Sequence, residues 1–186
     1  MTTLDQLVQL IPPPAHPLEL ADSKLRKAVE RILGFSFPNE LREFAVRYGS
    51  GVFRDGPEGG IELTVFNPAA PAYLHRVLEE CNYLQQIANS DRKDDMAYDV
   101  YPKRPGLFPW GQDNRGDDFF WLIDDSSSSW AVIVRGAHYE WARVEVSLVT
   151  FLMQCVTNSL KGTQWDEAGF FADPSGITFE ARPLVR

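Results

Sequence analysis

Four short apolar and aromatic runs between residues 107 and 144 constrain the fold of this chain most strongly. They span residues 107–110, 119–123, 131–134 and 140–144, and glycine, asparagine, aspartate and serine separate them. Short runs of this length, with turn residues between them, are typical of strands joined by hairpins. The spacing therefore predicts an antiparallel meander.

Helical spacing surrounds the meander on both sides. We expect helices at residues 4–11, 22–34, 38–48, 71–90 and 146–160. In the second of these, the spacing predicts a core-facing side made of Leu25, Ala28, Val29, Ile32 and Leu33. In the third, Glu43 is placed to pair with Arg47, and Gly49 and Gly51 are expected to supply a left-handed exit.

Two further segments alternate apolar and polar residues as strands do. One is residues 61–66, and the other is residues 177–181, which follow a turn signal and are expected to add an edge strand. No internal repeat or interdomain linker is found. The chain is therefore predicted to form a single α+β domain, an antiparallel sheet of about four to six strands flanked by helices. We expect an N-terminal extension at 1–21, the domain at 22–160 and a C-terminal tail at 161–186.

Composition limits the function classes. The formal net charge is −8, which disfavours nucleic-acid and anionic-membrane binding and suits a basic protein partner. The N-terminus has no basic region and breaks at Pro12, and no stretch is long and apolar enough to span a bilayer. We expect a cytoplasmic protein, with Cys81 and Cys155 as reduced, buried thiols.

The segment PWGQDNRGDDFFWLIDD, residues 109–125, is the strongest candidate for chemistry, because five aspartates lie among its aromatic residues. As a calcium loop it fails, since aligning Asp113 and Asp117 to ligand positions puts Arg115 between them and Gly116 ahead of its place. As an acid/base pair, Asp113 and Asp117 flank a turn and can approach each other. No other residue completes a catalytic constellation around them.

For partner binding, the candidates are five aspartates that would steer a cationic partner and two tryptophans that would anchor it. They are Asp113, Asp117, Asp118, Asp124 and Asp125, with Trp110 and Trp130. A solvated turn is the alternative for each aspartate, and a core position is the alternative for each tryptophan. We expect no catalytic residue, metal ligand or cofactor, because the histidines and cysteines are scattered.

Two stretches in the first third of the chain carry a family resemblance. GFSFP at residues 34–38, followed by Leu41, and YGSG at residues 48–51 resemble the opening of the SMI1/KNR4 (SUKH) superfamily. In that family, a helix ends in a Leu-Gly…Leu-Pro turn and the next helix ends in Tyr/His-Gly-x-Gly. Here Phe37 stands where leucine is usual.

The resemblance continues to about residue 160, so it covers most of the chain from residue 22. LFPWG at residues 107–111, with Asn114, Gly116 and Asp117, resembles the family's strand pair with its Asn-Gly-Asp turn, although Arg115 is inserted. Phe151-Leu152 resembles the Phe-Leu of the family's last helix.

The resemblance implies a non-enzymatic α+β domain that binds proteins. Bacterial members of the family are commonly immunity proteins that neutralise toxins, often nucleases, and eukaryotic members are regulatory interaction proteins. We therefore expect an immunity protein that binds a cognate toxin directly, and the acidic charge favours a basic, nuclease-like toxin. The alternatives are a regulatory or scaffold protein without a toxin partner, and a hydrolase or metal-dependent enzyme that uses the acidic hairpin.

Overall fold

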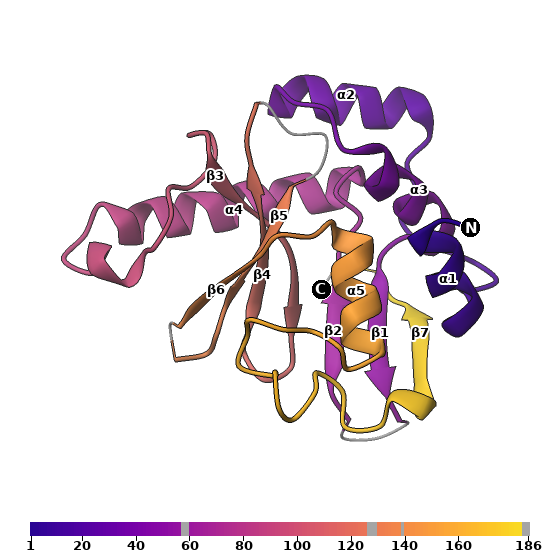
Figure 1. Ribbon diagram of the computed structural model, residues 1–186. Helices are drawn as coiled ribbons and strands as arrows, with labels where there is room; N and C mark the ends of the chain where they lie inside the picture. Colours follow the sequence, from indigo (N-terminus) through magenta and orange to yellow (C-terminus); the bar gives the residue numbers. More distant parts are fainter. Residues whose placement is uncertain (57–59, 126–129, 139, 184–186) are drawn as a thin grey trace.

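The computed structural model describes residues 1–56, 60–125, 130–138 and 140–183. Over these ranges the chain forms one α+β domain with five α-helices and a seven-stranded antiparallel sheet (Figure 1). The α+β class is confirmed, and the expected number of strands was too low. The run of serines at 126–129, predicted to be a turn, lies outside the described residues.

The sheet has the strand order β6-β5-β4-β3-β2-β1-β7, and every neighbouring pair is antiparallel. The strands are β1 (Gly51–Asp55), β2 (Glu62–Val65), β3 (Gly106–Asp113), β4 (Asp118–Ile123), β5 (Ala131–Arg135), β6 (Trp141–Val144) and β7 (Ile177–Ala181). The predicted meander is confirmed as β3 to β6. The predicted tail strand is also confirmed, because β7 pairs with β1 in the register Phe53 to Phe179 and forms one edge of the sheet.

All five predicted helices are present. They are α1 (Thr3–Leu10), α2 (Ser23–Leu33), α3 (Asn39–Tyr48), α4 (Pro71–Ala88) and α5 (Leu148–Val156), with short 3-10 turns η1 (Lys93–Asp95) and η2 (Pro174–Gly176). The ends of α2 follow from its sequence, because the Asp22 side chain accepts a hydrogen bond from the Leu25 N–H and Gly34 adopts a φ of 71°.

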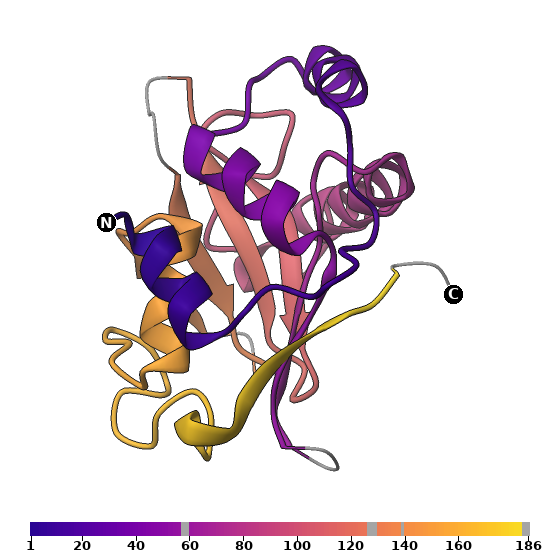
Figure 2. The same ribbon diagram turned by 90° about the vertical axis from the view of Figure 1, so that its right-hand side faces the viewer.

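The helices cover the two faces of the sheet differently. Figure 2 shows α1 and α5 on one side of the strands and α4 on the other. Tyr48 of α3 packs on Phe53 and Phe179, which places α3 on the α5 side. Helix α4 packs against β3, and the opposite end of that face, over β2, β1 and β7, carries no helix (Figures 1 and 2).

The segment at residues 1–21 is packed into the domain, although the sequence predicted an extension. Leu4, Leu7 and Ile11 are buried, and the Tyr48 hydroxyl donates a hydrogen bond of 2.6 Å to the Ile11 carbonyl. Further along, Gly49 has a φ of 68°, and a Cβ at this position would lie 2.2 Å from the Leu18 carbonyl oxygen. A glycine is therefore required where this segment crosses the end of α3.

Three local predictions are corrected by the structure. Gly51 is the first residue of β1 instead of a left-handed helix exit, so a strand was missed there. Leu25 and Ile32 of α2 are exposed, while Val29 and Leu33 are buried. Arg47 pairs with Asp5 of α1 at 3.1 Å, and no ion pair with Glu43 is found.

No helix in the described part of the chain is both long enough and apolar enough to cross a membrane.

Candidate functional site

The aspartates of the β3–β4 turn are part of the folded scaffold. The buried carboxylate of Asp113 accepts hydrogen bonds from the N–H groups of Arg115 and Asp117, at 2.9 and 3.0 Å, and from Arg115 Nε at 2.7 Å. Asp117 accepts one from the Ala137 N–H at 2.9 Å. Burial, and then the charge of Asp113, raise the pKa of Asp117. Asp113 and Asp117 thus hold the β3–β4 turn in place and connect it to the segment that follows β5.

Arg115 joins the turn to the C-terminal segment. Its guanidinium lies 5.0 Å from the ring centre of Trp165 and 4.5 Å from that of Phe170, and Nη1 donates to the Phe170 carbonyl at 3.2 Å. The residue that disqualified a calcium loop thus neutralises the aspartates and packs on two aromatic rings.

Two of the remaining candidate aspartates also have arginine partners. Asp118 is paired with Arg135 at 2.5 Å, and the exposed Asp125 is paired with Arg104. Asp124 is half-buried. Because ion pairs cancel most of the field at a distance, these aspartates supply little of the predicted steering.

The two tryptophans proposed as anchors are core residues, and this corrects the prediction that they contact a partner. Trp110 is fully buried against Phe119 and Phe151, and Trp130 is buried against Phe35 and Trp121. The physical reason is that the sheet face beneath α5 requires large apolar side chains to fill it.

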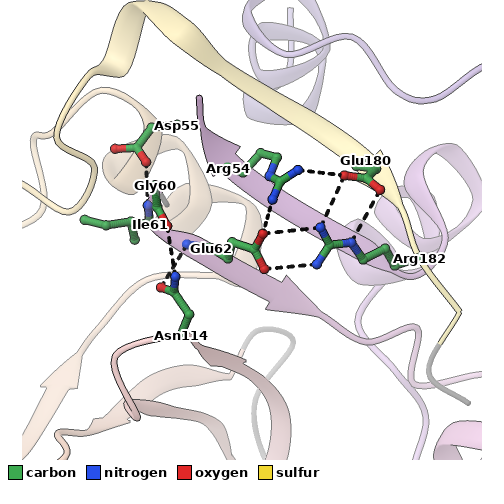
Figure 3. Close-up of polar contacts among 8 residues, drawn as sticks. All are labelled: Arg54, Asp55, Gly60, Ile61, Glu62, Asn114, Glu180 and Arg182. Carbon is green, nitrogen blue, oxygen red and sulfur yellow. Dashed lines mark hydrogen bonds and ion pairs between the residues drawn. The ribbon is translucent and has the colours of Figure 1, made fainter. Parts of the chain in front are cut away.

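A cluster of four charges occupies the helix-free face of β7, β1 and β2 (Figure 3). Arg182 Nη1 lies 2.9 Å from a Glu62 oxygen and its Nη2 lies 3.3 Å from a Glu180 oxygen, while Arg54 pairs with both glutamates. Hydrogen bonds from Arg182, then from Arg54, hold the pKa of Glu62 below its usual value. Two positive and two negative charges neutralise each other, so the cluster fastens β7 to the sheet and leaves no charge unpaired.

The turns beside this cluster are also held by side chains. The Asp55 carboxylate accepts from the N–H groups of Ile61, Ala172 and Asp173 at 2.5, 2.6 and 3.3 Å, and Asn114 bonds to the backbone of Gly60 and Glu62 (Figure 3). These contacts tie the loop that leads into β2 both to the β3–β4 turn and to the C-terminal segment.

A groove between α2 and α3 differs from these regions, because one of its two arginines, Arg26, forms no ion pair with a described residue. It encloses about 300 Å³, counting its open mouth. Its walls are largely apolar and carry two arginines, and they comprise Ala21, Arg26, Phe37, Leu41, Arg42, Ala45, Val46, Asn67, Pro68 and Ala69. A second, shallower hollow shares Arg26, Arg42 and Val46 with it and extends to Arg47.

Both arginines of the groove have hydrogen-bonding capacity to spare. Arg42 uses its terminal nitrogens on Glu30 at 2.8 Å and Asn39 at 3.2 Å. The Nε atoms of Arg26 and Arg42 are buried, and neither has a partner in the described part of the chain. Arg26 makes no ion pair with a described residue. Buried donors without partners are rare in folded proteins, because each costs free energy.

Charge and exposed apolar surface also gather in this region. Residues 22–48 contain six basic and four acidic residues and carry a net charge of +2. The rest of the chain carries −10, which gives the total of −8. Five of the eight exposed large hydrophobic side chains among the described residues come from positions 18–46, namely Leu18, Leu20, Leu25, Ile32 and Val46. An apolar surface with basic residues is thus exposed on an acidic protein.

Sequence reasoning missed this groove. The signal was present in α2, which reads SKLRKAVERIL and carries four basic residues against one acidic residue. The apolar positions of α2 were assigned to the core, although only one side of the helix is covered. In the described ranges, no three histidine, cysteine or acidic side chains lie together as a metal site would require.

No family model, curated protein or solved structure matches this chain. The SMI1/KNR4 resemblance therefore stays a prediction from the sequence.

Proposed function

We propose that this chain is a protein-binding domain that takes an acidic, partly apolar segment of a partner into the groove between α2 and α3. The observation that carries the proposal is that Arg26 and Arg42 line an apolar hollow, and that the buried Nε of each has no partner among the described residues.

The chemistry of the groove selects the segment. A carboxylate accepts hydrogen bonds from guanidinium groups, and such charge-assisted bonds are stronger than neutral ones. Leu41, Ala45 and Val46 offer apolar contact beside the arginines. A segment that places an acidic side chain next to apolar ones satisfies both features, whereas a basic segment is repelled by Arg26.

The narrower role, immunity against a cognate toxin, is supported by the family resemblance. The groove suggests which part of the toxin is recognised, namely an acidic segment, whatever the net charge of the whole toxin. Co-expression with a toxin encoded beside this gene is expected to restore growth. Rescue that persists after the groove is altered would contradict the groove as the binding surface.

Peptide selection tests the proposed function without a known partner. Random peptides are displayed and selected on the wild-type domain, and the binders are measured on the double variant R26E/V46D. We expect acidic peptides with apolar residues to be enriched, and to lose binding to the double variant and at high salt. Enrichment of basic peptides, or equal binding to both proteins, would refute the proposal.

Lys27 provides the matched control. It neighbours Arg26 on α2 but does not line the groove. The variant K27E makes the same change of charge as R26E, so a general electrostatic effect would weaken binding equally in both. A groove-specific effect is expected to be much larger in R26E.

A further inference from the structure

A further hollow lies between α4 and strands β3 and β4. It encloses about 370 Å³, counting its open mouth. The polar residues on its walls are Tyr73, Arg76 and Glu80 from α4, and Gln112 and Asp118 from the sheet. Phe66 and Phe120 are among its apolar residues.

Two acceptors in this hollow are not used by the fold. The Glu80 carboxylate is half-buried and makes no hydrogen bond or ion pair with a described residue. Arg135 donates to Asp118 from both Nε and Nη2, but both bonds reach the same oxygen, Oδ2. Within the described ranges, Oδ1 of Asp118 therefore has no donor.

A third polar group is buried beside them. Tyr73 is fully buried, and its hydroxyl has no hydrogen-bond partner in the part of the chain that the structure describes. Glu80 and Tyr73 both come from α4, and both residues line the hollow. Buried polar groups normally have partners, so the unpaired Tyr73 hydroxyl stands out beside the two partly exposed carboxylates.

The two cations near the hollow are already engaged. Arg135 is bound to Asp118 and lies 5.7 Å from the ring centre of Phe120. Arg76 donates to the Gln112 side chain at 3.1 Å and lies 4.9 Å from the ring centre of Phe66. Burial, and next the charge of Asp118, raise the pKa of Glu80, while Arg135 and Arg76 act in the opposite direction.

We propose that this hollow binds a protonated primary amine, with its ammonium group between Glu80 and Oδ1 of Asp118. An ammonium group has three donors, and these two carboxylates offer acceptors for them. Phe66 and Phe120 line the same hollow and offer apolar contact to the alkyl part of the amine. A neutral alcohol supplies a single donor, and an anion is repelled by both carboxylates.

The test uses n-butylammonium chloride as the probe, with 1-butanol, sodium butyrate and sodium chloride as controls. Binding is followed by the melting temperature and by amide chemical shifts of the full chain. We expect saturable stabilisation by the amine alone, because a ligand that binds only the folded state stabilises it, with shifts centred on residues 73–80 and 112–118.

Two variants of neighbouring glutamates make the test specific. Glu79 is exposed on the same helix and pairs with His75 at 3.2 Å, so E79Q removes the same charge outside the hollow. We expect E80Q to fold and to bind the amine at least about tenfold more weakly, and E79Q to bind as the wild type does. Y73F is expected to fold normally and to bind more weakly than the wild type.

Three outcomes would overturn the proposal. They are the absence of saturable binding at millimolar amine, equal stabilisation by 1-butanol, and equal affinities of E80Q and E79Q. Folding of each variant is checked by its own melting curve. Because the probe does not involve the groove between α2 and α3, these outcomes are independent of the proposed protein-binding function.

Discussion

The arginines of this protein fall into two groups that lie in different regions. On the helix-free face of the sheet, Arg54 and Arg182 each form ion pairs with both Glu62 and Glu180, although the buried Nε of Arg54 has no hydrogen-bond partner among the described residues. Beside α2 and α3, Arg26 has no ion pair with a described residue, and the Nε atoms of Arg26 and Arg42 have no acceptor. Matched charges stabilise the fold, whereas unmatched charges at a groove are available to a ligand. The number of charges on a surface therefore says less about ligand binding than whether those charges already have partners within the fold.

The largest expected effect comes from a matched charge in the interior. Asp113→Ala removes the acceptor of three hydrogen bonds and leaves Arg115 without its closest carboxylate. Breaking a buried ion pair from one side typically costs about 3–5 kcal/mol of the free energy of unfolding. Urea denaturation measures it. Asp99→Ala, which breaks an exposed pair with Lys103, is the control and should change stability by less than about 0.5 kcal/mol.

The charge cluster on the sheet face should show a smaller loss. Glu62→Gln removes the charge that pairs with both Arg54 and Arg182, and we expect a loss of about 1–2 kcal/mol, since the cluster is partly solvated. Thermal and urea unfolding measure it. Glu180→Gln, at a more exposed position, should lose less. Equal losses of stability in the two variants would show that solvation of the carboxylates, and not ion pairing, determines their contribution at this surface.

A change in the groove between α2 and α3 should weaken binding and leave stability nearly unchanged. Arg26→Gln is expected to change the free energy of unfolding by less than about 0.5 kcal/mol, because no described residue pairs with Arg26. The same variant is expected to weaken a selected acidic peptide about tenfold, roughly 1.4 kcal/mol. Fluorescence anisotropy of the labelled peptide provides the affinity. A clear loss of stability in Arg26→Gln would show that this arginine, like Arg54 and Arg182, has partners within the fold.

The smallest expected effects are changes in the pH dependence of stability, and they differ in sign between matched and unmatched carboxylates. The pKa of Glu62 is lowered from 4.5 in the folded state, so its contribution is present above 4.5 and is lost as pH falls through its folded pKa. The pKa of Glu80 is raised from 4.5, so the folded state binds the proton more tightly and stability falls as pH rises from 4.5 through the folded pKa.

Unfolding curves collected over this pH range in both variants separate the two effects. Glu62→Gln should flatten the acid side of the stability profile, and Glu80→Gln should flatten the decline on the neutral side. If Glu80→Gln keeps the pH dependence of stability of the wild type, the Glu80 carboxylate is not buried enough in the folded state to raise its pKa.

The elements that the sequence located well are those with local signals. The cap at Asp22 and the glycine at position 34 marked the ends of α2, and regular turn residues separated the strands from β3 to β6. Strand β1 was missed because Val52 and Phe53 are both buried, so this central strand shows no clean alternation. The tail strand β7 was found because its outer residues do alternate.

The candidate site was predicted less well, because local pattern does not reveal burial. Five aspartates close together suggested a charged surface, yet Asp113 and Asp117 are buried and accept hydrogen bonds from backbone groups that fold back on them. Likewise, α2 has a readable amphipathic pattern, but the pattern alone could not show that Leu25 and Ile32 would remain uncovered.

Local patterns in the sequence were enough to predict the class of fold, the order of its helices and of all strands except β1, and most of their ends, because caps, turns and hydrophobic periods act over a few residues. Which charges are matched depends on the tertiary structure. Arg182 and Glu62 are 120 residues apart, and Arg47 and Asp5 are 42 apart, yet each pair is in contact. A charge finds its partner, or is left free for a ligand, according to which distant segments the packing of the core brings beside it.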